Sequence, residues 1–233
     1  MCGAFDVQFE KFTASLVNAL DVEQLKKEGW NNCFSNIQAV INDGHKNRLI
    51  DASWSLDQVK DDNGNWKPMS SKFDKRINKV RNHSTFNCRW YADHGRFNFN
   101  FRDDFKHRRC IIPATAFVEG MNKVYHRLQP VGQAIAFAGF YRAWPTDEGA
   151  VYSCSLLTTT PHPKLDKIHK KAMPVMLPID DDTMKMWLDP SFNDTGAFTD
   201  LFDPVLRTDF EVTKLSKWRS FEPSDAPYII EAD

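Results

Sequence analysis

The chain has 233 residues, of which 42% are hydrophobic and 26% are charged, a composition typical of one globular domain or two small ones and unlike that of a disordered chain. The net charge of −1 excludes a global electrostatic attraction to nucleic acid or membrane, so any such footprint must be local. No window approaches about 18 uninterrupted apolar residues, and the first residues lack the basic and apolar regions of an export signal. We therefore expect a cytoplasmic protein with no membrane partner.

Two helices are predicted near the N-terminus. Three apolar side chains recur there at helical spacing: Phe9, Phe12 and Leu16. Asp21 and Gln24 then resemble a capping box that opens a second short helix, running toward Gly29.

The middle of the chain is predicted to form strands, because short apolar runs alternate there with Pro, Gly and Asn. These runs cover residues 37–41, 49–56, 110–118, 134–141, 152–158 and 173–177. A last helix is expected to be capped by Asp181 and Asp182 and to present Met184, Trp187 and Leu188. With no repeat and no linker, the pattern predicts a single α+β domain over residues 1–233 with a strand-rich core.

The five cysteines argue against both a disulfide framework and a zinc site. They are odd in number, far apart and without a CxxC pair: Cys2, Cys33, Cys88, Cys110 and Cys154. We expect reduced thiols and neither a metal nor an organic cofactor.

Charge is unevenly distributed along the chain. Residues 66–102 hold nine basic residues against two aspartates, with aromatic residues between them, whereas residues 179–203 hold seven aspartates against one lysine. Cations that meet phosphates and rings that stack on bases suit a single-stranded nucleic-acid groove. A charge run is also typical of a solvated face, and aromatics spaced like Phe97, Phe99 and Phe101 are typical of the buried face of a strand.

The second residue carries the most chemistry. If Met1 is removed, which a small following residue permits, Cys2 presents a thiol and a free α-amine on one residue. Their ordinary pKa values of about 8.5 and about 7.7–8.0 leave useful amounts of both nucleophiles near neutral pH. Such a 1,2-aminothiol can condense with an aldehyde and close to a thiazolidine, or it can attack an amide carbonyl.

The order of several short segments resembles the SRAP family, the SOS-response-associated peptidases, whose members shield abasic sites in single-stranded DNA by covalent attachment. The segments are Trp54-Ser55-Leu56, Asn87-Cys88-Arg89, Ala116-Phe117-Val118-Glu119, Thr158-Thr159-Thr160, and the run from Ile168-His169 to Met173-Pro174-Val175-Met176-Leu177. The resemblance spans essentially the whole chain. It implies a barrel-like core with peripheral helices, a monomer, and a place in the cytoplasm at the nucleoid, or in the nucleus of a eukaryote.

The resemblance also implies a catalytic set. Cys2 is the residue that crosslinks to DNA, Asn87 positions the abasic sugar, Glu119 moves protons and His169 completes the site. Autoproteolytic peptidase and lyase-type activities are implied as well. Glu119 could instead be an ordinary surface carboxylate, and His169, within a lysine-rich run, could be merely solvated.

Four further residues are implied as DNA contacts. Arg89 would hold a phosphate, Thr158 and Thr159 would contact the backbone, and Trp54 would lie at the DNA surface. Asn78 is a rival to Asn87, but only Asn87 has an arginine two residues on.

The sequence departs from the family pattern at several positions. Ala4 replaces an arginine, Ser35 ends an altered Asn-x-Ala-Pro segment, and Gly120 stands where an aromatic residue follows the glutamate. The spacing from His169 to Met173 is longer than usual.

Two other functions remain open. A glutamine amidotransferase with an N-terminal cysteine nucleophile also begins Met-Cys-Gly, although such enzymes continue with an apolar residue and a second glycine, unlike Ala4-Phe5-Asp6. A noncatalytic single-strand binding module would use only the basic aromatic window at residues 66–102. Crosslinking with Cys2 blocked separates that module from the SRAP activity.

Overall fold

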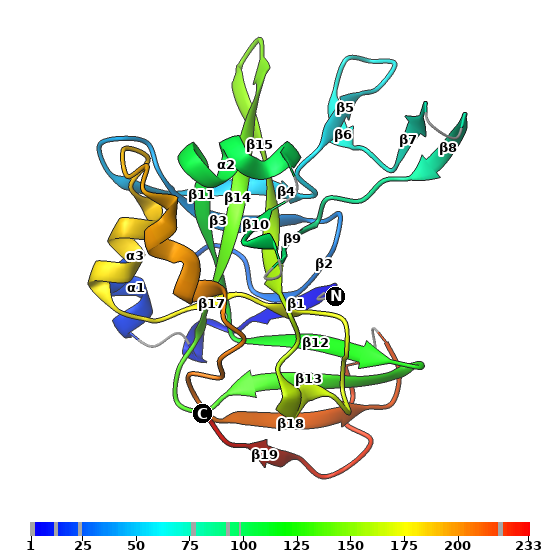
Figure 1. Cartoon of the computed structure of the whole chain (residues 1–233), viewed down its shortest axis with the longest axis vertical. Helices are drawn as coiled ribbons and strands as arrows, with labels where there is room; N and C mark the ends of the chain where they lie inside the picture. The colour runs from blue at the N-terminus through cyan, green and yellow to red at the C-terminus, as the bar shows by residue number, and fades with distance from the viewer. Residues whose placement is uncertain are drawn as a thin grey trace.

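A closed barrel of five strands forms the centre of the molecule (Figure 1). The computed structural model describes residues 3–11, 14–22, 25–75, 78–91, 94–97, 99–218 and 221–233. In order around the barrel the strands are β15 (Gly149–Thr159), β4 (Asn47–Trp54), β3 (Asn36–Asn42), β11 (Arg109–Ala114) and β14 (Ile135–Thr146), which pairs with β15 again. The predicted strands at 37–41, 49–56, 134–141 and 152–158 and the barrel-like core are therefore confirmed.

The apolar runs of these strands are continuous because both of their faces are buried. On β3, Ile37, Ala39 and Ile41 join a cluster shared by all five barrel strands, whereas Val40 joins a second cluster formed with the helices. Alternate residues of one strand thus fill two cores.

A second, six-stranded sheet closes one end of the barrel (Figure 1). Its order is β19 (Tyr228–Ile230), β18 (Phe210–Leu215), β13 (Val124–Pro130), β12 (Ala116–Met121), β1 (Ala4–Val7) and β2 (Gly29–Asn32). Phe5, Phe117 and Phe210 from this sheet pack into the same cluster as the barrel interior. The two sheets therefore share one hydrophobic core.

Two predicted strands are each divided in the structure. The run at 110–118 becomes β11 in the barrel and β12 in the second sheet, and between them the Thr115 backbone N–H donates to the Asp6 carbonyl at 2.8 Å. The run at 173–177 becomes β16 (Met173–Pro174), which pairs with β15, and β17 (Met176–Leu177), which pairs with β14. Apolar periodicity does not mark where a strand changes partners.

Only one of the two predicted N-terminal helices is present in the described residues. Helix α1 (Ala14–Leu20) contains the fully buried Leu16 and follows the 3₁₀ turn η1 (Phe9–Lys11), while Phe12 lies outside the described residues. The second helix is wrong for the described residues, since Asp21 has a φ of 48°, residues 25–28 are not helical and strand β2 already begins at Gly29. Gln24 lies outside the described residues. The backbone N–H groups of residues 26 and 27 donate to the Gln38 side chain instead of a helical carbonyl.

The predicted C-terminal helix is confirmed as α3 (Asp181–Leu188), but its cap is one residue earlier than expected. Asp180 accepts the N-cap hydrogen bond from the Thr183 N–H at 2.7 Å, so Asp181 and Asp182 lie in the first turn. The other helical pieces that the described residues form are α2 (Arg102–His107), η3 (Phe99–Phe101), η4 (Pro163–Leu165) and η5 (Thr195–Phe202). None of the helices in the described part of the chain has the length and apolar character needed to cross a membrane.

Two hairpins project from the barrel at the upper right of Figure 1. One pairs β5 (Gln58–Lys60) with β6 (Trp66–Pro68), and the other pairs β7 (Ser71–Asp74) with β8 (Lys79–Asn82). The chain then returns to the barrel as β9 (Asn87–Tyr91), which runs parallel to β15 and pairs with β10 (Arg96–Phe97). Strand β9 therefore connects the projecting hairpins to the barrel.

Candidate active site

Glu119 is a buried carboxylate in the second sheet. Along β12 it lies on the same face as Phe117, which belongs to the shared core, and its exposed fraction is only 3%. This burial raises the pKa of Glu119 to about 7. The surface-carboxylate alternative is therefore wrong, and Glu119 is poised to accept and release protons near neutral pH.

His169 lies directly against Glu119. Its Nδ1 is 2.9 Å from the Gly120 carbonyl and 3.6 Å from Glu119 Oε2, and its own backbone N–H donates to the Leu165 carbonyl at 2.8 Å. The buried Leu165 and Ile168 anchor this segment in the core, so the solvated alternative is wrong. Burial lowers the pKa of His169, against the hydrogen bond to Gly120, which raises it. In the neutral ring Nδ1–H donates to Gly120 and Nε2 is an acceptor.

Asn87 and Arg89 share one face of β9. The intervening Cys88 and the following Trp90 are buried in the cluster that faces the helices, so the half-buried Asn87 and Arg89 face the other way. Strand β9 pairs with β15 so that Arg89 lies next to Thr158. Because Asn87 and Arg89 are two residues apart on a strand, the amide and the guanidinium lie on the same side of β9.

The segment that carries His169 also reaches Arg89. The Arg89 guanidinium donates to the carbonyl of Lys171, two residues after His169. One connection between β15 and β16 thus contacts Glu119 through His169 and the β9 strand through Lys171. Lys171, whose carbonyl contacts Arg89, lies in the lengthened stretch between His169 and Met173.

Cys2 and Met1 lie outside the described residues, whereas Gly3 and Ala4 are described. The Gly3 carbonyl accepts a hydrogen bond from the Cys33 N–H at 3.0 Å, and Ala4 pairs with Val118 of β12. In an antiparallel pair the register advances in opposite directions, so the chain before Ala4 comes alongside the residue after Val118, which is Glu119. The described N-terminal segment therefore approaches the buried carboxylate.

Two of the residues predicted to contact DNA have side chains that are closed to solvent, so contact with DNA stays a prediction for them. Trp54 is 0% exposed and its Nε1 donates to the Phe86 carbonyl at 2.8 Å. Thr159 is also buried, and its hydroxyl donates to the carbonyl of Phe202, a residue of the cluster formed with the helices. Thr158 is buried too, but its hydroxyl has no hydrogen-bond partner among the described residues, and a role toward DNA stays a prediction that requires its neighbours to move.

The rival asparagine lies away from this site. Asn78 is an exposed residue at the end of the β7–β8 turn, where its φ of 52° is one that asparagine tolerates. Of the two candidates, the structure leaves Asn87 as the one that shares a strand face with Arg89.

The departures from the family pattern have local structural reasons. Ala4 is completely buried against Val118 and Leu215, which leaves no room for an arginine side chain. A Cβ added at Gly120 would lie 2.4 Å from Cδ1 of Tyr125, so the Tyr125 ring fills the space beside Gly120. Sequence reasoning did not identify Tyr125 or the Lys171 carbonyl, because neither a cross-strand ring nor a backbone acceptor has a local sequence signal.

Gly120→Ala is expected to destabilise the fold by about 1–3 kcal/mol, because the new methyl group would also lie 2.7 Å from the Val124 carbonyl oxygen. Denaturant unfolding measures this loss. Adding Tyr125→Ala relieves the ring contact but not the backbone contact, so it should restore only part of the stability. A Gly120→Ala variant as stable as the wild type would contradict this packing.

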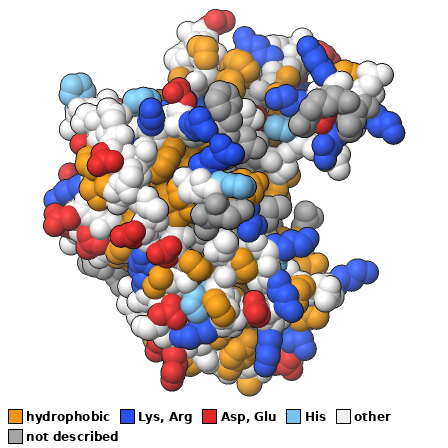
Figure 2. Space-filling model, in the orientation of Figure 1, with side chains coloured by type: hydrophobic (Ala, Val, Ile, Leu, Met, Phe, Trp, Pro, Cys, Tyr) orange, Lys and Arg blue, Asp and Glu red, His pale blue; other side chains and the backbone are white. Residues whose placement is uncertain are grey.

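The basic aromatic window divides into buried and exposed parts. Trp90, Phe97 and Phe101 are buried in the core beside the helices. The burial of Phe97 and Phe101 agrees with the alternative interpretation, but they do not share one strand, because β10 ends at Phe97 and Phe101 lies in η3. Phe73 and Tyr91 are exposed. Figure 2 shows Lys and Arg side chains on the projecting hairpins and acidic side chains on the opposite side over α3, where Asp181 and Asp182 are exposed.

The described thiols and carboxylates form no metal site. No group of three or more His, Cys, Asp or Glu side chains in the described ranges is arranged to hold a metal ion. Cys88, Cys110 and Cys154 form no disulfide, as predicted for these three, and burial raises the pKa of each of their thiols. Those three are therefore poor nucleophiles.

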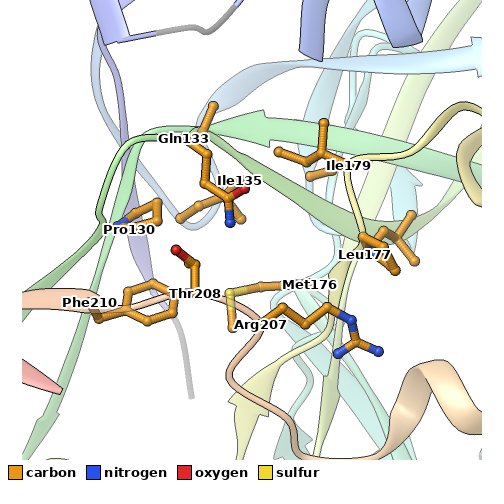
Figure 3. A pocket seen from close by; sticks show the side chains of 12 residues that line it. Pro130, Gln133, Ile135, Met176, Leu177, Ile179, Arg207, Thr208 and Phe210 are labelled. Carbon is orange, nitrogen blue, oxygen red and sulfur yellow. The ribbon is translucent and has the colours of Figure 1, made fainter. Parts of the chain in front are cut away.

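A cavity of about 190 Å³ lies elsewhere, between the start of β14, β17 and the chain before β18 (Figure 3). Its lining is apolar apart from Gln133, Arg207 and Thr208. It is smaller than the roughly 300–1,000 Å³ of ordinary ligand pockets. The chemistry-bearing groups are instead at the Glu119–His169 pair.

The fold and the site define a class: a barrel protein with a buried glutamate–histidine pair beside its N-terminal strand. The family model of SRAP, SOS response associated peptidase, matches residues 1–218. The chain belongs to this family.

Relatives and solved structures agree with this membership. The abasic site processing protein YoqW of Bacillus subtilis (strain 168) is 29% identical over 252 residues, with 100% of both chains covered. The abasic site processing protein YoaM of the same organism is 28% identical over 248 residues, covering 100% of this chain and 99% of YoaM. A crystal structure of a Bordetella bronchiseptica protein has a TM-score of 0.64 at 16% identity, covering 92% of this chain and 100% of that one. One from Bacteroides thetaiotaomicron has a TM-score of 0.62 at 20% identity, covering 92% of each chain. These two structures share the fold.

Proposed function

We propose that this protein processes abasic sites in single-stranded DNA by forming a covalent thiazolidine through Cys2 after removal of Met1. The observation that carries the proposal is the buried Glu119–His169 pair at the point where the N-terminal strand approaches it. Cys2 precedes Gly3 in the chain, so the described segment nearest to Glu119 is the one attached to the proposed nucleophile. The names of the relatives YoqW and YoaM support the same substrate.

The chemistry moves protons at every stage. The closed abasic sugar opens to an aldehyde and a hydroxyl when a proton passes from the anomeric oxygen to the ring oxygen. The α-amine of Cys2 then adds to the aldehyde carbon, and the carbinolamine loses water to give an imine. Addition of the Cys2 sulfur to the imine carbon, with its proton passing to nitrogen, closes the five-membered ring.

Glu119 and His169 are suited to move these protons. With a pKa of about 7, Glu119 is present as acid and as base in comparable amounts near neutral pH, so it can donate in one step and accept in the next. His169 is neutral there, and with Nδ1–H engaged by Gly120, its Nε2 accepts a hydrogen bond or proton from a sugar hydroxyl. Asn87 would orient the opened sugar with its amide.

The same proposal covers location and assembly. We propose a monomer with one domain over residues 1–233, acting in the cytoplasm at the nucleoid, or in the nucleus if the host is a eukaryote. Peptidase activity would be confined to release of the N-terminal segment that precedes Cys2, and lyase activity to the abasic strand. Membership in the SRAP family favours this function over that of an amidotransferase.

Incubation of the purified protein with an abasic oligonucleotide tests the proposal. A band of lower mobility that survives heat and denaturant is expected with the abasic strand and is not expected with an undamaged strand of the same sequence. A denaturation-resistant band with both strands, or with neither, would contradict it.

Noncovalent affinity for undamaged single strands should fall with salt, with a log–log slope of about −0.7 per neutralised phosphate. Arg89→Ala should make this slope shallower by about one contact, because a guanidinium bonded to one carbonyl keeps other N–H groups for a phosphate. Titrations at a series of salt concentrations measure the slope, with Arg48→Ala on the barrel as the control. Equal slopes for the wild type and Arg89→Ala would remove Arg89 from the DNA surface.

A further inference from the structure

The β7–β8 hairpin has two unlike faces. Phe73 and Val80 lie directly opposite each other and are 52% and 67% exposed. Their neighbours along the strands project to the other side, where Lys72 faces Arg81. The hairpin therefore combines an exposed ring and aliphatic group on one face with three cations and one carboxylate on the other, where Arg81 donates to Asp74 Oδ2 at 3.3 Å and Lys79 lies opposite Asp74.

This exposure is unusual for so small a unit. In the described part of the chain, β7 and β8 form a two-stranded sheet joined to neither of the two large sheets (Figure 1). A lone hairpin has marginal stability in water, and an exposed apolar pair on it adds none. Apolar surface kept outside the core is typical of a contact site.

The base of the hairpin is nevertheless firmly held. The His83 N–H donates to the Ser70 carbonyl at 2.9 Å, and His83 Nε2 lies 2.7 Å from Asp57 Oδ2. Asp57 also bonds the guanidinium of Arg142 in β14, and its backbone N–H donates to Thr85 Oγ1 at 2.8 Å. These hydrogen bonds attach the base of the hairpin, and with it the exposed Phe73 and Val80, to the barrel.

The hairpin also lies close to the candidate active site along the chain. Only four residues separate Asn82, the last residue of β8, from Asn87 of β9, so the five steps of chain span about 17 Å at most. Lys75 and Lys79 add further exposed cations to the described part of the hairpin. The β7–β8 hairpin is therefore tethered close to the strand that carries Asn87.

We propose that the β7–β8 hairpin is a second DNA-contact surface, in which Phe73 stacks on a base of the single strand to one side of the lesion. The neighbouring cations neutralise phosphates of the same strand. A π-face stacks on any base, so this contact adds affinity without sequence preference. The inference rests on the proposed function for its substrate, and extends it by naming a contact beyond the lesion nucleotide.

Strands of graded length test the proposal. They carry a tetrahydrofuran abasic analogue, which has no aldehyde and so reports noncovalent affinity, and are extended one nucleotide at a time on either side of the lesion. Wild-type affinity should rise about tenfold when extension on one side reaches the hairpin. Phe73→Leu should lose this gain while binding the shortest strand like the wild type, and Phe73→Trp should keep it.

Ile229→Ala serves as the matched control, because Ile229 is also 52% exposed but lies on β19 at the edge of the other sheet. It should leave every affinity unchanged. An equal length-dependent gain in the wild type and Phe73→Leu would overturn the proposal. The proposal would also be overturned if the wild type is a dimer and Phe73→Leu makes it a monomer without changing DNA affinity. The hairpin would then contact a second copy of the chain instead of DNA.

Crosslinking to a short strand with a true abasic site separates the two hypotheses. Phe73→Leu should crosslink there at the wild-type rate, which also shows that the variant is folded. Absence of crosslinking by the wild type would contradict the proposed function, whereas wild-type crosslinking with no effect of Phe73→Leu on the longer strands would contradict only the hairpin contact.

Discussion

Replacing Cys2 with alanine is expected to abolish the heat-stable adduct with abasic DNA and to leave noncovalent DNA affinity nearly unchanged. The ring needs its nitrogen and its sulfur on the same residue, and no other thiol can supply the sulfur in that geometry. Cys2→Ala keeps the α-amine, so it should still form an imine. Borohydride, which reduces a C=N bond, should trap that imine as a stable adduct, whereas the untreated variant should yield none on a denaturing gel.

Cys33→Ala is the matched control for this result. Cys33 is half-buried and its backbone N–H donates to the Gly3 carbonyl, so this variant tests whether a cysteine near the N-terminal strand other than Cys2 is required. It should crosslink like the wild type. A tag left ahead of Cys2 should block crosslinking because it removes the free amine. A full yield of heat-stable adduct from Cys2→Ala would exclude the thiazolidine mechanism.

Glu119→Gln is expected to slow crosslinking by roughly 10²–10⁴-fold, the usual contribution of a positioned acid or base. Glutamine keeps the shape and most hydrogen bonds of the side chain but cannot exchange a proton. DNA affinity should barely change. Single-turnover rates with saturating protein measure the effect, and Glu148→Gln, at an exposed turn, is the control.

The pH dependence of these rates should identify the group. Wild-type rates should show an inflection near pH 7, where Glu119 titrates, and this inflection should be absent from Glu119→Gln. Wild-type rates in Glu119→Gln at every pH would remove Glu119 from the site.

The same titration makes a prediction for stability. Burial raises the pKa of Glu119 from 4.5 to about 7, so between these values the folded state holds a proton that the unfolded state has lost. Stability of the wild type relative to Glu119→Gln should therefore fall as the pH rises through this window, by on the order of 3 kcal/mol in total. Unfolding of both proteins at pH 4.5 and 7.5 measures the difference. A constant difference would show that Glu119 is not buried in solution.

The sequence predicted those features whose signal is local. Continuous apolar runs predicted the barrel strands, because burial of both faces requires apolar residues at consecutive positions. The order of short motifs pointed to Glu119 and His169, which the fold brings to within 3.6 Å of each other. Neither residue alone would have been distinguished from a surface group.

Features that depend on distant partners were not predicted. The chain changes sheets at Thr115, where its backbone N–H donates to the carbonyl of the distant Asp6. The second helix is missing where a backbone N–H group donates to the side chain of Gln38, which is also distant in the sequence. Trp54 was assigned to DNA because it belongs to a motif, yet its ring is buried in the barrel. A motif aromatic can maintain the core instead of contacting a ligand.

Mass spectrometry of the adduct identifies the atoms of the protein that bind the abasic sugar. The protein is crosslinked to an abasic oligonucleotide, digested with nuclease and protease, and the modified peptide is sequenced. We expect a single modified peptide that begins at Cys2, without Met1, and carries the sugar remnant on both the α-nitrogen and the sulfur of Cys2. A remnant on a lysine, on Cys33 or on a peptide that retains Met1 would contradict it.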